Sequence, residues 1–303
     1  MRIECQQAYL SLLRGATRRM GYEMLKNVWS EEAAYSQFAK EALDRRRFYN
    51  VGAGEFRHPH WTNVDHLSEY YAANLRRSGI DLDYDLFSLT PLPIESGVAE
   101  AIYSSHTIEH VTNAAANHFL RESYRILRPG GFLRLTTPDI DLEYRAWKDD
   151  DRAYFYWVNY HPRAGGNVAL DAPQWTEVER RRVNATTSQV FLHHFASAAS
   201  VLHREGSHER ISDAELARVF STRPYEEALD YCTSKCPLEI QREQPGNHMN
   251  WWNWRKLSKM LTEAGFANPR RSGYGQSFCH AMRDIRLFDF NSPKTSIYVE
   301  ANK

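Results

Sequence analysis

The sequence predicts an α/β fold, built on a mostly parallel sheet with a cofactor site at the carboxyl ends of its strands. An apolar segment, Phe48–Val51, runs directly into a glycine turn, and a second short segment ends on Asp65. Further apolar segments then alternate with an amphipathic helix. A strand entering a glycine turn, beside a strand ending on a carboxylate, is how such sheets hold a nucleoside-bearing cofactor.

The glycine turn consists of Gly52, Ala53 and Gly54. Glycine has no Cβ, so the backbone can turn sharply and approach a ligand closely. Asp65 can accept hydrogen bonds from both hydroxyls of a ribose. The glycines have a structural alternative, because an ordinary turn between two strands can contain the same residues. The interval from Gly54 to Asp65 is well below the roughly 20 residues of a dinucleotide fold. We therefore expect the first helix to be reduced to a turn near His58–His60, which argues against a nicotinamide enzyme.

The later segments keep the order of an α/β sheet. Asp85–Phe87 precedes a short buried strand, Val98–Ser105, that stops at polar residues. Phe119–Leu127 has one apolar and one charged side, which predicts an amphipathic helix. Arg128–Gly131 is expected to end that helix, because proline cannot continue it and glycine accepts the left-handed exit. Phe132–Thr137 is then another strand.

As an ordered set, these segments resemble class I S-adenosylmethionine-dependent methyltransferases. The set comprises the glycine turn, Asp65, Ser105–His110 after the fourth strand and Arg125–Gly131 before the fifth. The resemblance implies a Rossmann-like sheet whose last strand is antiparallel, and S-adenosyl-L-methionine as the cofactor. The residues implied to bind the cofactor are Gly52, Ala53, Gly54, Asp65, Asp85, Leu86, Ser105 and His106.

The sequence departs from the broader family pattern at two positions. Asn50 stands where many members have an acidic residue, and Phe56 occupies the third glycine position. We expect the Asn50 amide to hydrogen-bond to the loop amides instead.

A narrower resemblance concerns the end of the chain. Leu261–Phe266 and Ser296–Ala301 are similar to a branch associated with bacterial surface-polysaccharide synthesis. This resemblance implies O-methylation of a sugar hydroxyl of a surface glycan or its precursor. Two alternatives stay open: an enzyme acting on a small-molecule or lipid-intermediate acceptor, and a non-catalytic scaffold that binds S-adenosylmethionine.

Three parts are expected along the chain. Residues 1–46 form an N-terminal helical cover, in which Ser30 can cap a helix opening at Glu31. Residues 47–140 and 247–303 form the methyltransferase domain. Residues 141–246 are too many for a loop in a compact fold, so they form a helical insertion after the fifth strand that walls the acceptor pocket. Its expected helices cover 141–160, 186–203, 213–220 and 225–232, and the helix 251–264 returns the chain to the sheet.

Methylation of a hydroxyl calls for a general base, since a sugar hydroxyl is almost fully protonated at neutral pH. The candidates are His106, at the tip of the fourth strand, and Asp139, at the tip of the fifth. His106 lining the methionine end of the cofactor, and Asp139 capping the following segment, are the structural alternatives. Glu109 and His110 are expected to orient the loop. Other histidines near the insertion are His161, His193, His194 and His248.

Composition limits the remaining possibilities. The 38 Lys and Arg residues balance the 38 Asp and Glu residues, so general attraction to nucleic acid is not expected. No apolar run approaches the roughly 20 residues of a membrane span, which predicts a soluble, cytoplasmic protein with peripheral membrane association left open. The four cysteines are scattered, so neither a disulfide framework nor a metal site is expected. The oligomeric state is not predicted.

Overall fold

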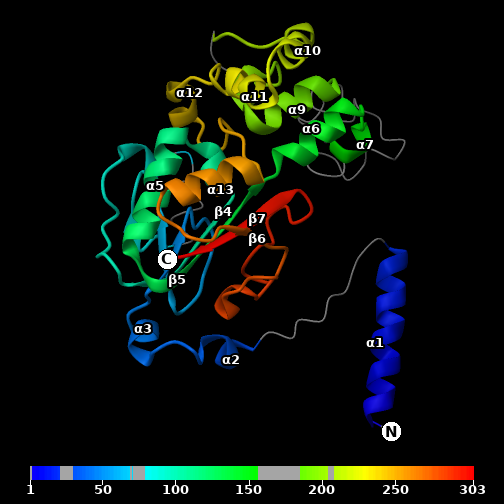
Figure 1. Ribbon diagram of the computed structural model, residues 1–303. Helices are drawn as coiled ribbons and strands as arrows, with labels where there is room; N and C mark the ends of the chain where they lie inside the picture. The colour runs from blue at the N-terminus through cyan, green and yellow to red at the C-terminus, as the bar shows by residue number, and fades with distance from the viewer. Residues whose placement is uncertain (1, 21–29, 69, 71–78, 156–184, 204–207) are drawn as a thin grey trace.

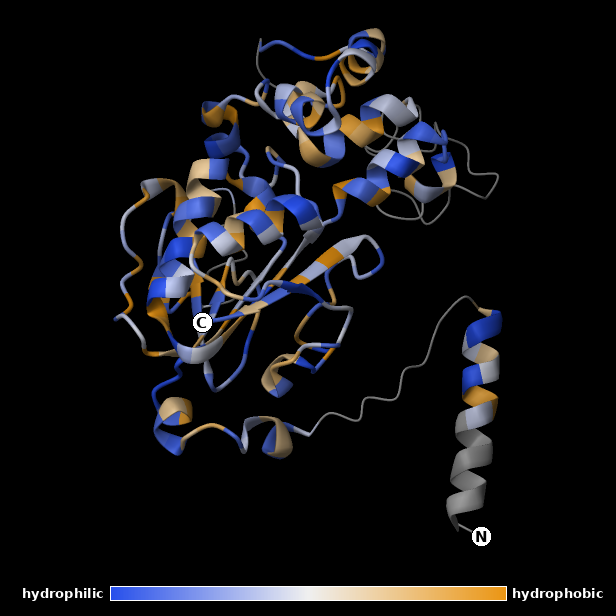
Figure 2. Ribbon diagram, viewed as in Figure 1, coloured by the Kyte–Doolittle hydropathy of each residue, from blue (hydrophilic) through white to orange (hydrophobic). Residues whose placement is uncertain are grey.

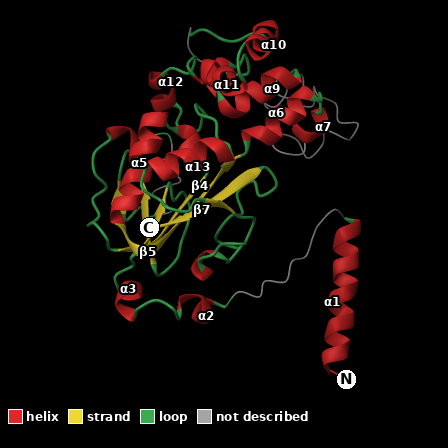
Figure 3. Cartoon of the chain, viewed as in Figure 1, coloured by secondary structure: helices red, strands yellow, loops and turns green. Residues whose placement is uncertain are grey.

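The computed structural model describes the chain except residues 1, 21–29, 69, 71–78, 156–184 and 204–207. A sheet in the order β3-β2-β1-β4-β5-β7-β6 forms its centre (Figures 1 and 3). Strands β1 to β5 pair in parallel, whereas β7 is antiparallel to both β5 and β6. The strands are β1 (Phe48–Val51), β2 (Trp61–Asp65), β3 (Leu82–Asp83), β4 (Ala99–Ser105), β5 (Leu127–Pro138), β6 (Arg270–Arg271) and β7 (Ser296–Asn302). The predicted Rossmann-like sheet, with its last strand antiparallel, is confirmed.

Residues 52–60, between β1 and β2, contain turns and no helix, as the short interval predicts. One face of the sheet is covered by α5 (Asn113–Ile126) and α13 (Trp254–Glu263), which pack with the strands into a large apolar core. Helix α5 begins earlier than predicted because Thr112 caps it, its hydroxyl accepting from Ala115 N at 3.2 Å. The prediction that Arg128–Gly131 ends the helix is wrong, because the helix ends at Ile126 and these residues open β5.

The other face of the sheet is covered by short elements. These are α2 (Glu31–Tyr35), α3 (Lys40–Asp44) and η5 (His280–Met282), and α2 begins at the predicted cap, where Ser30 Oγ accepts from Ala33 N at 3.4 Å. Phe48, Trp61 and Phe288 meet there in a second apolar core. Helix α1 (Arg2–Arg19) precedes these elements. Among the described residues, no helix combines the length and the apolar character needed to span a membrane.

The segment after β5 contains several helices with a third apolar core of their own, packed around Phe191, Leu216 and Trp251. They lie beyond one end of the sheet, and several carry alternating hydrophilic and hydrophobic bands, as amphipathic helices do (Figures 1 and 2). The elements are α6 (Ile140–Lys148), α7 (Arg152–Phe155), α9 (Thr187–Phe195), η4 (Ser197–Ala199), α10 (Asp213–Thr222), α11 (Tyr225–Thr233) and α12 (Leu238–Glu243).

Helices α10 and α11 begin at the predicted residues and extend slightly further than predicted, but two other helices in this segment are shorter than the sequence predicts. The helix expected over 141–160 is interrupted after Lys148, and the one expected over 186–203 ends at Phe195. Helix α12 was not predicted. Position 161, with His161, lies outside the described residues.

Candidate functional site

A cavity of about 410 Å³ opens at the carboxyl ends of β1, β2 and β4. This is the edge of an open α/β sheet where ligands bind, and the volume lies within the range of small-molecule sites. The predicted residues that line it are Gly52, Gly54, Asp65, Asp85, Leu86 and His106; they are joined by Val51, Glu55, Val64, His66, Ser68, Tyr84, Phe87, Thr107, His110, Val111 and Pro245.

The glycine turn is fixed from two sides. Gly52 has φ +71°, and a Cβ on it would lie 2.1 Å from Thr107 Oγ1, so a side chain is excluded both by the backbone and by the neighbouring loop. Gly54 has φ +53°, and its N–H donates to Asp65 Oδ2 at 2.8 Å. The turn is therefore folded back onto the carboxylate at the end of β2.

Asp65 has the surroundings of a ligand-binding carboxylate. Its Oδ1 accepts from His66 N at 2.8 Å, so each oxygen holds one backbone N–H and keeps a second acceptor position. Burial raises the pKa of Asp65, and the N–H groups of Gly54 and His66 oppose this. A ribose diol in the cavity would complete the hydrogen bonds of both oxygens.

Three of the predicted cofactor-binding residues do not have the simple cavity-lining position expected of them. Asp85 lines the cavity but also caps η1 (Leu86–Ser88), with its Oδ1 accepting from Phe87 N at 2.8 Å. Ala53 and Ser105 do not line the cavity, and Ser105 Oγ instead shares a hydrogen bond of 2.8 Å with Thr136 Oγ1. Asn50 is buried, and its Oδ1 has no hydrogen-bond partner in the described part of the chain, so the expected bond from the loop amides to this oxygen is not formed.

His106 stands at the wall of the cavity in an uncommon backbone conformation. Its φ is +50°, a left-handed value in which side chains other than glycine are rare. The Nε2 atom shares a hydrogen bond of 2.8 Å with Ser296 Oγ at the start of β7, and Nδ1 lies 3.1 Å from Glu109 Oε1. The imidazole is thus held between a hydroxyl and a carboxylate, where the ends of β4, β5 and β7 meet.

Glu109 contacts more groups of the site than expected, since the sequence indicated only that it orients the loop. It lies in η2 (Ile108–His110), is almost fully buried, and its Oε2 accepts from Thr137 Oγ1 at 3.0 Å. Burial by itself raises the pKa of this carboxyl, but the neighbouring histidines, His106 first, bring it down to about 2. Its spacing of three residues from His106 was the available signal in the sequence.

Asp139 occupies the other predicted base position but has a structural task. It caps α6, its Oδ1 accepting from Asp141 N at 3.2 Å, and Arg271 Nη2 lies 3.5 Å from its Oδ2. Burial and the charge of Asp141 raise the pKa of Asp139 to about 6. Asp139 is not among the residues lining the cofactor cavity.

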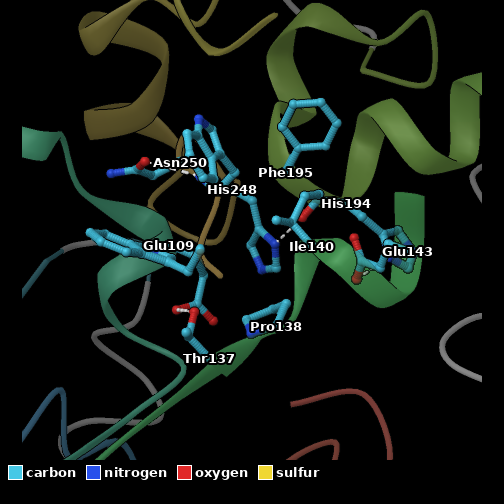
Figure 4. A pocket seen from close by; sticks show the side chains of 11 residues that line it. Glu109, Thr137, Pro138, Ile140, Glu143, His194, Phe195, His248 and Asn250 are labelled. Atoms are coloured by element: carbon cyan, nitrogen blue, oxygen red, sulfur yellow. Dashed lines mark hydrogen bonds and ion pairs between the residues drawn. The ribbon is translucent and has the colours of Figure 1, made fainter. Parts of the chain in front are cut away.

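A second, much smaller cavity of about 10 Å³ lies beside the first, between the strand ends and the helices after β5 (Figure 4). Glu109, His194 and His248 are among its lining residues, and its volume suits about one water molecule. His194 Nδ1 lies 3.0 Å from Glu143 Oε1, so this histidine is held inside the helical segment.

Part of the chain matches a known protein family. Residues 59–135 match a family described as a methyltransferase domain, and this range contains Asp65, Asp85, His106 and Glu109. No curated protein matches. Similar solved structures include S-adenosylmethionine-dependent methyltransferases from Thermotoga maritima (12% identity, 90% of this chain and 88% of that chain, TM-score 0.38) and Mesorhizobium loti (16%, 90% and 98%, 0.37).

The sheet order and the methyltransferase-domain match over residues 59–135 support a methyltransferase enzyme. S-adenosylmethionine is its cofactor. The cavity fits that cofactor, because a glycine turn excludes side chains at one end and a half-buried carboxylate with open acceptor positions stands beside it.

Proposed function

We propose that the protein methylates the oxygen of a hydroxyl group, and that this hydroxyl belongs to a sugar of a bacterial surface glycan or its precursor. The observation that carries the proposal is the His106–Glu109 pair at the cavity wall. Amine and thiol acceptors need less help from a base, whereas a hydroxyl must lose its proton as it reacts. An imidazole backed by a buried carboxylate is suited to take that proton.

We propose separate roles for the residues around the cavity. Gly52, Gly54 and Asp65 would hold the cofactor, with Asp65 on the ribose, and S-adenosylmethionine supplies an electrophilic methyl group when bound. His106 would accept the hydroxyl proton at Nε2, the nitrogen that already shares a hydrogen bond with the hydroxyl of Ser296. Glu109 would keep the hydrogen of His106 on Nδ1.

Further proposed contacts and the alternative base come from the sequence analysis. Ala53, Asp85, Leu86 and Ser105 would complete the cofactor site, with Ala53 and Ser105 acting from beside the cavity. Asp139 stays the second candidate base, because a pKa of about 6 suits proton transfer near neutrality.

The sugar part of the proposal rests on the resemblance of Leu261–Phe266 and Ser296–Ala301 to enzymes of polysaccharide synthesis. The helices after β5 stand beyond the strand ends, where an acceptor-binding cap would be. We also propose that the chain divides into an N-terminal helical cover (1–46), a methyltransferase domain (47–140 and 247–303) and an acceptor-binding cap (141–246). A small-molecule or lipid-intermediate acceptor is the alternative enzyme function.

The test combines cofactor binding with an acceptor screen. Purified protein is titrated calorimetrically with S-adenosylhomocysteine, then incubated with methyl-labelled S-adenosylmethionine and nucleotide sugars, lipid-linked sugars, amines and thiols. We expect Asp65→Ala to lose most of the affinity. We expect His106→Asn to bind normally but lower kcat by roughly 10²–10⁴-fold. His118→Gln changes a half-buried histidine on α5 that does not line the cavity, and it should behave as wild type.

The outcomes separate the hypotheses. A methyl ether on a sugar supports the proposal, while methylated amines or thiols, or an unchanged kcat in His106→Asn, contradict it. Normal cofactor binding without turnover on any acceptor would favour the non-catalytic scaffold.

A further inference from the structure

Three side chains on the wall between the two cavities point potential metal ligands at one another. Glu109, His110 and His248 each offer one ligand atom, and these atoms lie within 4.8 Å of one another. The two imidazole rings meet edge to face with their centroids 4.7 Å apart. Glu109 and His110 come from η2 and His248 from the segment before α13, so the tertiary fold assembles the cluster.

Both histidines are oriented with one nitrogen occupied and the other available. His110 Nδ1 lies 2.9 Å from the carbonyl oxygen of Asn247, and His248 Nδ1 is hydrogen-bonded to the carbonyl oxygen of His194. A carbonyl oxygen only accepts, so each ring carries its hydrogen on Nδ1 and has a lone pair on Nε2. A backbone carbonyl holding the far nitrogen is the usual support of a metal-bound histidine.

The carboxylate supplies an independent observation. Glu109 is 1% exposed, and within the described residues its Oε1 has no hydrogen bond of acceptable geometry. The nearest groups are His106 Nδ1, at an ion-pair distance of 3.1 Å, and His110 Nε2, at 4.0 Å. A carboxylate oxygen has two acceptor positions, so even with His106 Nδ1 beside it, Oε1 can take one further partner inside this buried site.

We propose that Glu109, His110 and His248 bind a divalent transition-metal ion of the zinc type. Two imidazoles and one carboxylate are a ligand set that such ions prefer, while Mg²⁺ prefers oxygen ligands. Ligands at zinc bond lengths lie roughly 3.4 Å apart in a tetrahedral site. The ligand atoms, now within 4.8 Å of one another, therefore need to close by at most about 1.4 Å.

The position of the site gives the ion a role in the reaction. His110 lines the cofactor cavity, whereas Glu109 and His248 line the small cavity, where Figure 4 shows the His248 ring pointing toward the space above Glu109 and Pro138. Three protein ligands leave a coordination position for water or an acceptor oxygen. The ion would then polarise the acceptor hydroxyl whose proton His106 takes. This role rests on the proposed function; metal binding does not.

The test measures metal binding directly. Protein without a histidine tag is stripped with a chelator and titrated with Zn²⁺ by calorimetry, with Co²⁺ absorption as a second readout and Mg²⁺ in parallel. We expect one Zn²⁺ per chain, a cobalt spectrum of a low-coordinate site, and no Mg²⁺ binding. His110→Gln and His248→Gln should each weaken Zn²⁺ binding at least tenfold, while His118→Gln should not.

Folding and function are controlled separately. Thermal unfolding checks each variant, and Glu109→Gln provides a third, nearly isosteric test. Absence of stoichiometric Zn²⁺ binding to the wild type, or binding that persists unchanged in folded His248→Gln, would overturn the site. Calorimetry with S-adenosylhomocysteine on the stripped protein, and the acceptor screen with Zn²⁺ absent or restored, report on the proposed function independently.

Discussion

At the scale of single residues, the site depends on side chains placed under strain or deep burial. His106 holds a left-handed backbone, and Glu109 is buried among histidines. A left-handed backbone and a buried carboxylate each lower the stability of the fold unless neighbouring groups hold them in place. Such strained residues are concentrated at functional sites. His106 is fixed through its own backbone N–H, which donates to Thr136 O at 2.8 Å, and through Ser296. The loop after β4 is therefore the most constrained part of the cavity wall.

Asp139 gives a prediction at the same scale. Burial first, and the charge of Asp141 second, raise its pKa from 3.8 to about 6. Because the pKa of Asp139 is higher in the folded than in the unfolded protein, the folded state holds the proton more tightly. The resulting stabilisation is complete below the unfolded pKa and is lost as the pH rises through about 6. Asp139→Asn keeps an N-cap side chain without the charge, so it should stabilise the protein by about 2 kcal/mol at pH 7.5.

Urea unfolding at several pH values checks this expectation. The difference between Asp139→Asn and wild type should shrink below pH 6 and nearly vanish near pH 4. A variant that is less stable than wild type at pH 7.5 would show that the contact with Arg271 outweighs the burial of the charge.

At the scale of elements, a buried ion cluster fastens residues 272–289 to the sheet. Arg134 on β5 is fully buried; its Nε donates to Asp289 Oδ1 at 2.9 Å, and Glu300 on β7 lies 3.2 Å from its Nη1. Gly275 N also donates to Asp289, at 2.9 Å, and Asp289 N donates to the Tyr103 hydroxyl at 2.7 Å. Short elements can therefore cover this face of the sheet without a long helix.

Removing one charged partner of this buried cluster should lower the free energy of unfolding much more than removing a partner of a surface ion pair. Asp289→Ala leaves the Arg134 guanidinium buried and poorly compensated, so we expect a loss of about 3–5 kcal/mol in the free energy of unfolding. Glu263→Ala removes an exposed i, i+4 partner of Lys259 on α13 and should cost about 0.5 kcal/mol or less. Urea denaturation of both variants measures the contrast; equal losses would mean that the buried cluster contributes no more than a surface pair.

At the scale of the whole molecule, the cofactor cavity is built almost entirely from the loops after β1, β2, β3 and β4, whereas the helices after β5 have their own core. The two parts meet at η2, where the N–H groups of Met249 and Asn250 both donate to the Glu109 carbonyl, at 2.9 and 3.1 Å. A ligand in the cavity should therefore order the loops and leave the outer helices largely unaffected.

Hydrogen exchange with saturating S-adenosylhomocysteine tests this division. We expect exchange to slow by about tenfold or more over residues 51–56, 84–88 and 105–111. Exchange in α10 should stay the same, which makes that helix the internal control. Protection confined to α10 and α11, with the strand-end loops unchanged, would place the ligand elsewhere.

The sequence alone determined the sheet and the predicted positions of Gly52, Gly54 and Asp65, because alternating apolar segments, turns and strand-end carboxylates are local signals. It also indicated the absence of a helix between β1 and β2 from the interval alone. It did not reveal α12 or the early start of α5, since weak local preferences there are decided by caps and packing. Only the tertiary structure brought His248 to Glu109, and Ser296 to His106, because these pairs are joined through space by strands and loops distant in the chain.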